Sequence, residues 1–528
     1  MTDVESLREQ LRERGYLKYG IERWFALDPW SSRTFWAELA TVATKAATLV
    51  ALFGALPCVA IMLARNHPLS AIETLELFVI YSIAWAVVAF AVVIIVALLL
   101  KIRPELPIET SRGLLAVSII TSALLIVPLA AWWYAFDTMP SLVELIAGGA
   151  LAAIFFVVGT IVVSAALLSF TIYELKRIPA IHQKPRGIPL AAGAAILIGL
   201  LFIPAYAMPE RQESPPLQVV TMPVQRRIAL IAVDGLSDEI VRSRPDLLRE
   251  FATVRSFGTL AARSTTERWA SVGTGVPASL HGVRAVEGVR LFGGAHVLQS
   301  VSRGDVALRA AAQRQPLPPT IRRRDYVWEI FAARGVPSLA VNWWTTANGW
   351  SGALLSIGQE TIFGSARGDA LRVDAVATSD FIREIESHRP QFATVYLPAL
   401  DVILNRLALD PSSRVTMSIR ALEGIAPPVR AAREHGYDVF LIGLPGESQS
   451  GHAIIASTIP IRKPASAFDV APTVCALLGF PASDEMPGAT LIGTVTRIPT
   501  YGPRNVAMTQ TKMNQEYYES LRSLGYIR

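Results

Sequence analysis

Residues 227–283 contain the polar side chains whose placement is typical of a reactive site. The apolar run Ile228–Val233 ends on Asp234-Gly235, and about thirty residues later a hydroxyl cluster follows, with Thr265 at its centre. An open α/β sheet binds ligands beyond the carboxyl ends of its strands, where an acid after a strand can meet a hydroxyl on a later loop. The spacing therefore predicts that Asp234 and Thr265 belong to one site.

The elements that would position these two side chains follow an alternating pattern from residue 226 to the end of the chain. Strand-like apolar runs alternate with segments of helical pattern, which predicts an α/β domain with a mostly parallel sheet flanked by helices. The strand-like runs are Ile228–Val233, Ser338–Asn342, Ala393–Leu397, Val439–Gly443 and Ala453–Ser457, and the helical segments are Pro245–Phe251, Tyr326–Arg334, Asp374–Ile385 and Val415–His435.

The part of the chain before this domain has the composition of a membrane protein. The whole sequence is 52% hydrophobic and only 17% charged, and the apolar excess lies between residues 46 and 208. Five apolar runs occur there, each near or above the roughly 20 residues that a helix needs to cross about 30 Å of hydrocarbon. They cover residues 46–64, 77–100, 113–136, 142–170 and 188–208, and they predict five transmembrane helices.

The charges between the runs predict an orientation. Lys and Arg are frequent in residues 1–45 and in the links after the second and fourth runs, whereas the first link has only Arg65 and the third has none. The positive-inside rule then places the amino terminus in the cytoplasm and residues 209–528 outside a cytoplasmic (inner) membrane. Residues 1–45 fit either an amphipathic helix on the membrane surface or a solvated tail. The proline-rich stretch 209–225 is predicted to be a linker.

Composition also narrows the partners. The basic residues form no cluster of the kind that binds nucleic acid and instead flank the apolar runs, so membrane lipids are the expected partners. Cys58 and Cys475 lie far apart in the sequence, which excludes a disulfide framework. The apolar runs have no charged residue near their centres, which favours anchoring over transport.

Several stretches of residues 226–528 resemble the alkaline phosphatase superfamily, and within it the type I phosphodiesterase/nucleotide pyrophosphatase branch. They are VDGL (233–236) with TTERWASVGTG (265–275) and an HGV, VNWWTTANGW (341–350), FDVAPTVCALLGFP (468–481) with an MPG, and the closing LRSLGYIR, which is similar to the ends of many bacterial members. The resemblance implies a site with two metal ions, usually zinc, where a Thr or Ser attacks a phosphoryl or sulfuryl centre. Two cations would activate the hydroxyl and stabilise the charge on the transferred group.

The resemblance assigns roles to individual positions. Thr265 matches the nucleophile, since it stands nine residues before Thr274, and Asp234 matches the first metal ligand. Asp401 matches the acid of a second motif, and His452 matches the last histidine. His281 matches a turn residue that does not bind metal.

Two positions depart from the family pattern. Asn405 stands where the second motif has a histidine, and a neutral amide oxygen is a poor zinc donor. Leu444-Pro445 replace an Asp-His pair that would bind the same cation as Asp234. A site with one metal, built from Asp401 and His452 with Asn405 or Asp234, is conceivable, and Glu267 or Glu447 are candidate replacement ligands.

Two hypotheses follow from these departures. In the first, the chain is a membrane-anchored pseudoenzyme whose extracytoplasmic domain acts in binding or assembly, with a protein partner in the membrane or periplasm. In the second, it is an active metal-dependent phosphodiesterase, phosphatase or phospho-group transferase. Thr265 would then attack a phosphorylated or sulfated substrate of the envelope or the extracellular space.

Overall fold

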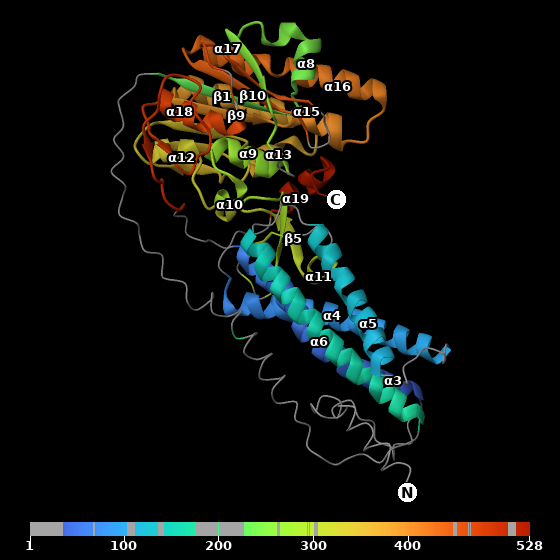
Figure 1. The fold of residues 1–528 in the computed structure, drawn as a ribbon. Coiled ribbons are helices and arrows are strands. Elements are labelled where there is room, and N and C mark those ends of the chain that lie inside the picture. Colours follow the sequence, from blue (N-terminus) through green and yellow to red (C-terminus); the bar gives the residue numbers. More distant parts are fainter. Residues whose placement is uncertain are drawn as a thin grey trace. The chain divides into compact units, whose positions relative to one another are not determined.

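The computed structural model describes residues 35–66, 69–102, 111–135, 142–175, 199, 226–260, 264–292, 294, 296–299, 305–446, 451–462, 464, 466–504 and 514–527. The chain divides into two compact units (Figure 1). The helical unit comprises Met1–Glu210 together with Val289–Gln313, and the α/β unit comprises Arg211–Gly288 together with Arg314–Arg528. The segment Val289–Gln313 therefore groups with the helices, whereas the alternating pattern of the sequence predicts one domain over residues 226–528.

Four long helices of the helical unit, all within the described residues, are apolar enough to cross a membrane. They are α3 (Phe35–Arg65), α4 (Ala71–Ile102), α5 (Ser111–Tyr134) and α6 (Leu142–Leu175). These helices coincide with the first four predicted spans. The fifth predicted span, 188–208, and the first 34 residues of the amino-terminal segment fall outside the described residues except for Gly199.

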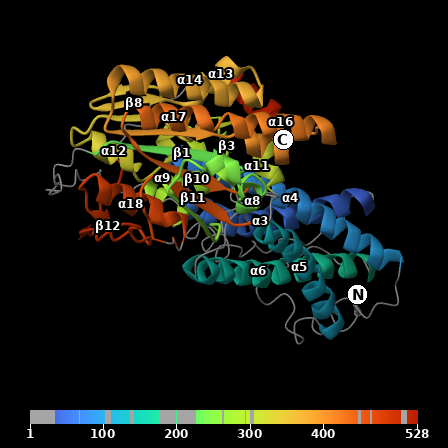
Figure 2. The same cartoon turned by 90° about the horizontal axis from the view of Figure 1, so that it is seen from above.

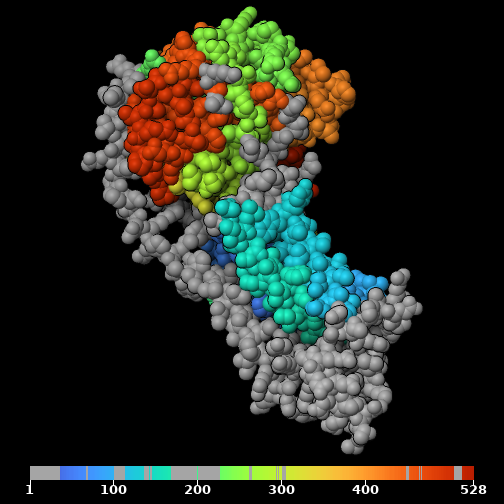
Figure 3. Space-filling model, in the orientation of Figure 1, coloured from blue at the N-terminus to red at the C-terminus, as the bar shows by residue number. Residues whose placement is uncertain are grey.

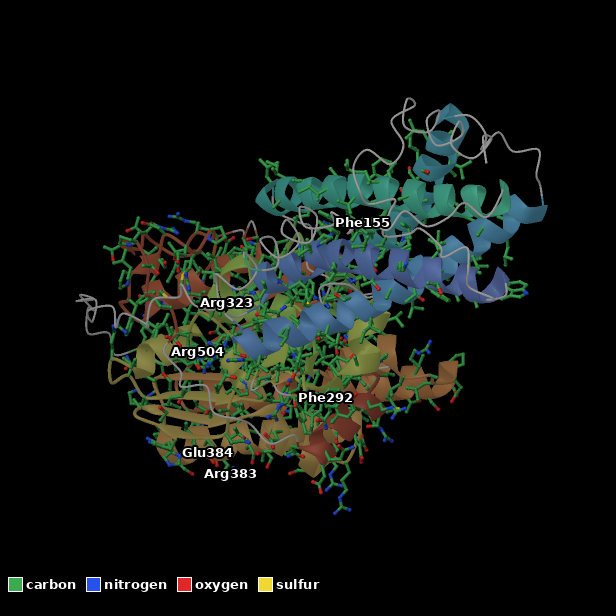
Figure 4. All side chains as sticks on the ribbon, turned by 90° about the horizontal axis from the view of Figure 1, so that it is seen from below. Phe155, Phe292, Arg323, Arg383, Glu384 and Arg504 are labelled. Carbon is green, nitrogen blue, oxygen red and sulfur yellow. The ribbon has the colours of Figure 1, made fainter. Side chains whose placement is uncertain are left out.

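Helix α3 is the central element of the helical unit, since it packs against both α4 and α6. Gly54 allows this close approach: a Cβ atom at Gly54 would lie 2.8 Å from the ring of Trp85 and 3.1 Å from the ring of Phe155. The two rings meet edge to face with centroids 5.0 Å apart, and Figure 4 labels Phe155. Such small residues let membrane helices gain packing contacts where lipid offers no hydrophobic driving force.

The segment Val289–Gln313 packs against the C-terminal end of α3 and the N-terminal part of α4. Its apolar side chains Val289, Leu291, Leu298 and Leu308 are buried in the same cluster as those of the helices. Glu73, which is fully buried, accepts hydrogen bonds from the backbone N–H of His296 at 2.9 Å and contacts the His296 Nδ1 at 2.7 Å.

Two more polar contacts continue this packing. The backbone N–H of Gln299 donates to Asn66 Oδ1 at 2.8 Å, and the Tyr81 hydroxyl donates to Asp305 Oδ2 at 2.6 Å. Each buried polar group is thereby given a partner, as burial requires.

The α/β unit is built on a mixed sheet of eight strands in the order β2-β11-β10-β1-β9-β6-β8-β7. The five strands from β10 to β8 run parallel, whereas β11 pairs antiparallel with both of its neighbours, β10 and β2, and β7 pairs antiparallel with β8. The prediction of a mostly parallel sheet thus describes the centre, and the reversed strands β11 and β7 make the sheet mixed. The strands are β1 (Ile228–Asp234), β2 (Thr253–Phe257), β6 (Ser338–Val341), β7 (Gly349–Ser351), β8 (Leu354–Ile357), β9 (Phe392–Leu397), β10 (Asp438–Leu444) and β11 (Ala453–Ser457).

Helices cover both faces of this sheet. The helices α14 (Ala370–His388), α16 (Pro411–Glu423) and α17 (Ala426–Glu434) lie on one face, and α9 (Thr265–Thr274), α12 (Val327–Ala332) and α18 (Val470–Leu477) lie on the other (Figure 2). Because both faces are covered, every residue of β1 and β9 is buried, which explains their continuous apolar sequences. The predicted helical segment Val415–His435 is two helices, since Pro427 and Pro428 start a new one.

The space-filling view shows the surface of the α/β unit, where C-terminal residues (red) lie beside residues from the first third of that unit (green) (Figure 3).

Shorter elements complete the chain. The remaining elements are α8 (Asp238–Ser243), η1 (Pro245–Leu248), α10 (Ala278–His281), β3 (Glu287–Arg290), β4 (Val297–Leu298), α11 (Val306–Ala311), β5 (Gln313–Pro316), η2 (Pro319–Ile321), α13 (Gln359–Ala366), α15 (Ala399–Asp401), η3 (Val402–Arg406), η4 (Ala467–Asp469), β12 (Ala482–Ser483), β13 (Arg497–Ile498) and α19 (Gln515–Ser523).

Candidate functional site

Asp234 is the last residue of the central strand β1, and its side chain is fully buried. Gly235 follows with φ of +84°, a conformation that favours glycine. A Cβ atom there would lie 2.5 Å from the backbone nitrogen of Asp401, so the glycine lets the chain after β1 touch the chain after β9. The two acids at the ends of these neighbouring strands are thereby brought together.

Thr265 is the first residue of α9 and is also fully buried. Ser264 caps this helix: its hydroxyl oxygen accepts from the Glu267 N–H at 3.1 Å and its hydroxyl donates to the Arg284 carbonyl at 2.7 Å. The cap fixes the first turn of α9 and therefore the position of the Thr265 hydroxyl.

Asp401 and Asn405 lie in a turn that directly follows β9. The short α15 ends at Asp401 and continues as the π-helical turn η3, in which the Leu407 N–H donates to the Val402 carbonyl at 3.0 Å. The wider turn brings side chains five residues apart to one side. The Asn405 amide donates to Asp401 Oδ1 at 2.8 Å, so this residue binds the acid rather than facing outward.

Arg406 connects the acid to the hydroxyl. Its Nε donates to Asp401 Oδ2 at 2.6 Å, and its Nη2 donates to Thr265 Oγ1 at 2.8 Å. A second guanidinium, that of Arg268, reaches Thr265 Oγ1 at 3.4 Å and also donates to the Pro445 carbonyl. Two positive charges therefore lie at the candidate nucleophile.

No motif of the sequence assigns a role to Arg268 or Arg406. Their positions carried a usable signal, since Arg268 follows Thr265 by three residues, close to one helical turn, and Arg406 stands next to Asn405. Arginine side chains offer no electron pair to a metal ion, so a metal-ligand pattern does not include them.

Asp234 is the titratable group most affected by this arrangement. Burial, and then the charge of Asp401, raise the pKa of Asp234 to about 7, while Arg268, Arg406 and the Tyr396 hydroxyl act in the opposite direction. The Tyr396 hydroxyl donates to Asp234 Oδ2 at 2.9 Å, and Asp234 Oδ1 has no hydrogen-bond partner among the described residues. Near neutral pH this carboxyl is therefore partly protonated.

The C-terminal end of the chain supports Arg406. The ring of Tyr526 lies under the guanidinium, with the Arg406 carbon Cζ 4.3 Å from the ring centroid. Gly525 has φ of +74°, and a Cβ atom there would lie 3.0 Å from the Arg406 side chain. Gly525 and Tyr526 thus hold the guanidinium that faces Asp401.

The backbone after β10 fills the space where the resemblance implies an Asp-His pair. The Leu444 carbonyl accepts from the Gly235 N–H at 2.8 Å. A Cβ atom at Gly446 would lie 2.2 Å from Asp401 Oδ1 and 2.1 Å from the Asn405 amide nitrogen, so main chain lies directly against these side chains. Glu447, a candidate replacement ligand, lies outside the described residues.

His452 does not join the cluster. Its backbone N–H donates to Asp238 Oδ1 at 3.0 Å, its Nδ1 lies 4.0 Å from Asp238 Oδ2, and its side chain is 65% exposed. No contact joins it to Asp234 or Asp401 among the described residues. The cluster therefore contains four of the five predicted site residues, namely Asp234, Thr265, Asp401 and Asn405.

His281 is the last residue of the short helix α10, and Gly282 follows it in the left-handed conformation. Its Nδ1 accepts from the Val283 N–H at 3.1 Å, and its Nε2 lies 3.0 Å from the Ser271 hydroxyl. Burial, and then the charge of Arg322, lower the pKa of His281 to about 3, so the ring is neutral. Such a histidine stabilises a turn.

The donor set of the cluster does not fit a divalent metal ion. Both Asp401 oxygens are bound by Asn405 and Arg406, and Thr265 is bound by two guanidinium groups. A dication would be repelled by these two arginines. Moreover, no group of three or more His, Cys, Asp or Glu side chains suited to a metal ion occurs in the described part of the chain.

Comparisons with known proteins give structural similarity only. No protein-family model matches the chain, and no curated protein matches it. Human ectonucleotide pyrophosphatase/phosphodiesterase 5 matches with 10% identity and a TM-score of 0.35, over 49% of this chain and 96% of that one.

Two further solved structures are similar to the same degree. The murine ectonucleotide pyrophosphatase/phosphodiesterase 5 matches with 11% identity and a TM-score of 0.34, over 51% of this chain and 97% of that one. Phosphonoacetate hydrolase from Sinorhizobium meliloti matches with 10% identity and a TM-score of 0.30, over 43% and 60%. At these scores and identities, the similarity carries no functional argument.

Proposed function

We propose that this chain is a membrane-anchored pseudoenzyme, whose α/β unit keeps the framework of an alkaline phosphatase-like site without its two-metal chemistry. The observation that carries the proposal is the position of Arg406, which bonds to both Asp401 and Thr265. In the family that the sequence resembles, a divalent cation would serve those groups. Here a guanidinium supplies positive charge and hydrogen bonds, without the open coordination positions of a metal.

The burial of Thr265 supports the same proposal. An attacking hydroxyl must reach an electrophile and must lose its proton to a base or be activated by a cation. Thr265 is 0% exposed, and its oxygen accepts from Arg406 and Arg268. Arginine remains protonated in proteins and cannot act as the base. These groups form a filled polar core, which suits a domain used for binding or assembly.

The membrane orientation is part of the proposal. The amino terminus would lie in the cytoplasm and the α/β unit outside, with membrane lipids and a protein partner in the membrane or periplasm as its contacts. The contact between Gln299 and Asn66 supports this orientation, since it joins a segment flanked by α/β sequence to the link after α3. That link is the one that the charge pattern assigns to the outer side.

Metal content and hydrolysis together test the proposal. The full chain would be purified in lipid nanodiscs, dialysed against zinc and analysed by elemental mass spectrometry, and assayed with bis(4-nitrophenyl) phosphate. We expect well under one zinc ion per chain and no hydrolysis above that of empty nanodiscs. Stoichiometric tight binding of two metal ions, or zinc-dependent turnover, would refute the pseudoenzyme.

One observation favours an active enzyme as the second candidate. Asp234 Oδ1 has no partner among the described residues, and a carboxyl with a pKa of about 7 is suited to proton transfer. In this case the chain would be a metal-dependent phosphodiesterase, phosphatase or transferase that uses Thr265 on a phosphorylated or sulfated substrate. Hydrolysis that disappears in Thr265→Ala and persists in Thr266→Ala would establish it.

A further inference from the structure

The segment Val289–Gln313 contacts α4 at two levels of that helix. Near the start of the helix, a Cβ atom at Gly294 would lie 2.9 Å from Glu73 Oε1. Further along, the Tyr81 hydroxyl donates to Asp305 Oδ2 at 2.6 Å. Glu73 and Tyr81 are eight positions apart, which is a rise of roughly 12 Å along a helix. The segment therefore lies beside the first turns of a helix that is apolar enough to cross a membrane.

The same turns of α4 carry exposed apolar side chains. Ile72, Leu75 and Val79 are exposed, and they recur at intervals of three and four residues, so they share one face of the helix. The exposed stripe continues to Val87 in the middle of the helix. On a helix that crosses a membrane, such a stripe contacts lipid. The lipid-facing stripe therefore begins at the level of the segment.

Aromatic side chains mark the second level. The rings of Tyr81 and Trp132 meet edge to face with centroids 6.2 Å apart. Trp132 lies near the C-terminal end of α5, which the charge pattern predicts to be an outer end. Tyr and Trp are enriched where a membrane meets water. Because Asp305 accepts from Tyr81, the segment lies at the depth of this interface.

Two apolar side chains of the segment point away from the protein. Phe292 is 90% exposed and Val306 is 74% exposed, whereas Leu291 and Leu308 are buried (Figure 4 labels Phe292). Among the described residues outside the four long helices, these two are the most exposed large apolar side chains. Phe292 lies in a tight turn, in which the Gly294 N–H donates to the Leu291 carbonyl at 3.2 Å. The turn holds the aromatic ring outside the packed cluster.

The segment also has a net positive charge. It contains Arg290, Arg303 and Arg309 but only one acid, Asp305, so three positive charges and one negative charge give +2. Asp305 is buried, which leaves the positive charges for outside partners. Guanidinium groups bind phosphate through paired N–H donors. The charge of the segment thus complements the phosphates of lipid head groups.

We propose that Val289–Gln313 binds the outer membrane–water interface, with Phe292 and Val306 among the lipid chains and Arg290 and Arg309 at lipid phosphates. A stretch of sequence that follows the first strands of the α/β unit is then a second anchor of the protein, in addition to the membrane helices. The word outer rests on the membrane orientation proposed above. The contact with lipid is independent of whether the Thr265 cluster is catalytic.

Spin labelling of the full chain in lipid nanodiscs tests the contact. Nitroxide labels at Phe292→Cys and Val306→Cys are compared with labels at Val87→Cys, on the lipid-facing stripe, and at Ser387→Cys, exposed on α14. The measurement is the collision rate with oxygen, which concentrates in lipid, divided by that with a water-soluble nickel chelate. We expect both ratios to be roughly threefold or more above that of Ser387→Cys and below that of Val87→Cys.

The labels report on the intended positions. Cys58 and Cys475 are buried, so the nitroxide reagent reacts with the introduced cysteines. All four replaced side chains are exposed, so the variants should fold as the wild type does. A ratio at either position no higher than that of Ser387→Cys overturns the proposal. Low access of both reagents also overturns it, because protein would then cover the side chain.

The charge is tested through the lipid composition. Nanodiscs of phosphatidylcholine are compared with nanodiscs that also contain the anionic phosphatidylglycerol. Because an anionic surface attracts basic residues, we expect the ratio at Val306→Cys to be about 1.5-fold higher with phosphatidylglycerol. The additional changes Arg290→Gln and Arg309→Gln should abolish this difference. Equal ratios in the two lipids before these changes would overturn the contact of the arginines with phosphates.

The orientation has its own test. A membrane-impermeant maleimide should label Ser387→Cys in right-side-out membrane vesicles and leave it unlabelled in inside-out vesicles. The opposite result refutes the proposed orientation. The collision ratios in nanodiscs do not depend on orientation, so failure of the lipid contact and failure of the orientation are distinguished.

Discussion

Arg406 and Thr265 are 141 residues apart in the sequence, and a 2.8 Å hydrogen bond joins the guanidinium of one to the hydroxyl of the other. The same guanidinium neutralises Asp401. Phosphoryl chemistry would require a cation beside Asp401 and Thr265. Here the positive charge at this place belongs to a side chain of the protein itself. In the proposed pseudoenzyme, this guanidinium takes the place of a metal ion and holds the acid and the hydroxyl in place.

Removal of Arg406 should destabilise the α/β unit. Arg406→Ala leaves Asp401, which is fully buried, without its ion partner, and breaking a buried pair from one side costs about 3–5 kcal/mol. We expect a lower unfolding temperature in differential scanning fluorimetry of the full chain. The exposed Arg372→Ala serves as the control. A variant as stable as the wild type would mean that Asp401 is neutral or solvated.

The charge of Asp234 should make stability depend on pH. The pKa of Asp234 is raised from 3.8 to about 7, so between these values the folded chain holds a proton that the unfolded chain has released. Stability is then greatest below pH 4, falls as the pH rises toward 7, and levels off above that. Asp234→Asn lacks this dependence, and its Oδ1 can still accept from Tyr396.

The measurement is the difference in unfolding free energy between Asp234→Asn and the wild type at several pH values. We expect the asparagine variant to gain relative stability from pH 4 to 7, on the order of 1–4 kcal/mol. A constant difference across this range would show that Asp234 is ionised throughout.

Tyr526 should act through its ring. Tyr526→Phe keeps an aromatic face under Arg406 and should cost less than about 1 kcal/mol. Tyr526→Ala removes a buried aromatic side chain and should cost about 3–5 kcal/mol. Chemical unfolding followed by tryptophan fluorescence distinguishes the two. Equal losses in both variants would assign the effect to the hydroxyl group.

The contact between Glu73 and His296 should protect the segment Val289–Gln313 from proteases. Glu73→Ala removes the acceptor of the His296 N–H groups, and a loss of about 1.4 kcal/mol or more opens the segment at least tenfold more often. Trypsin should then cleave after Arg290 or Arg309 at least tenfold faster in nanodiscs. Glu386→Ala, in the α/β unit, is the control, and unchanged cleavage in Glu73→Ala would show that apolar packing alone holds the segment.

The sequence predicts those parts of the fold in which local pattern and burial agree. The strands β1 and β9 are continuous apolar runs because helices cover both sheet faces, and Asp234 and Asp401, which the resemblance assigns to one site, follow these two neighbouring strands. The antiparallel direction of β11 could not be predicted, since a buried strand has the same apolar pattern in either direction.

The rest of the site depends on long-range contacts. His452 precedes β11 in the expected order, yet its contacts are with Asp238. Arg406 is the last residue of the π-helical turn η3, and its guanidinium reaches Thr265 from there. The hydrophobic periodicity of the sequence likewise does not indicate that Val289–Gln313 belongs to the helical unit. Its polar contacts to Asn66, Glu73 and Tyr81 join residues more than two hundred positions apart.

That last segment bears on how the protein is made. Val289, Leu291, Leu298 and Leu308 are part of the apolar cluster of the membrane helices, and Glu73 and Tyr81 find partners there. A ribosome that has released only the first two hundred residues has produced helices whose buried acid still lacks these donors. The membrane helices can therefore reach their final packing only after the chain has been synthesised past Gln313.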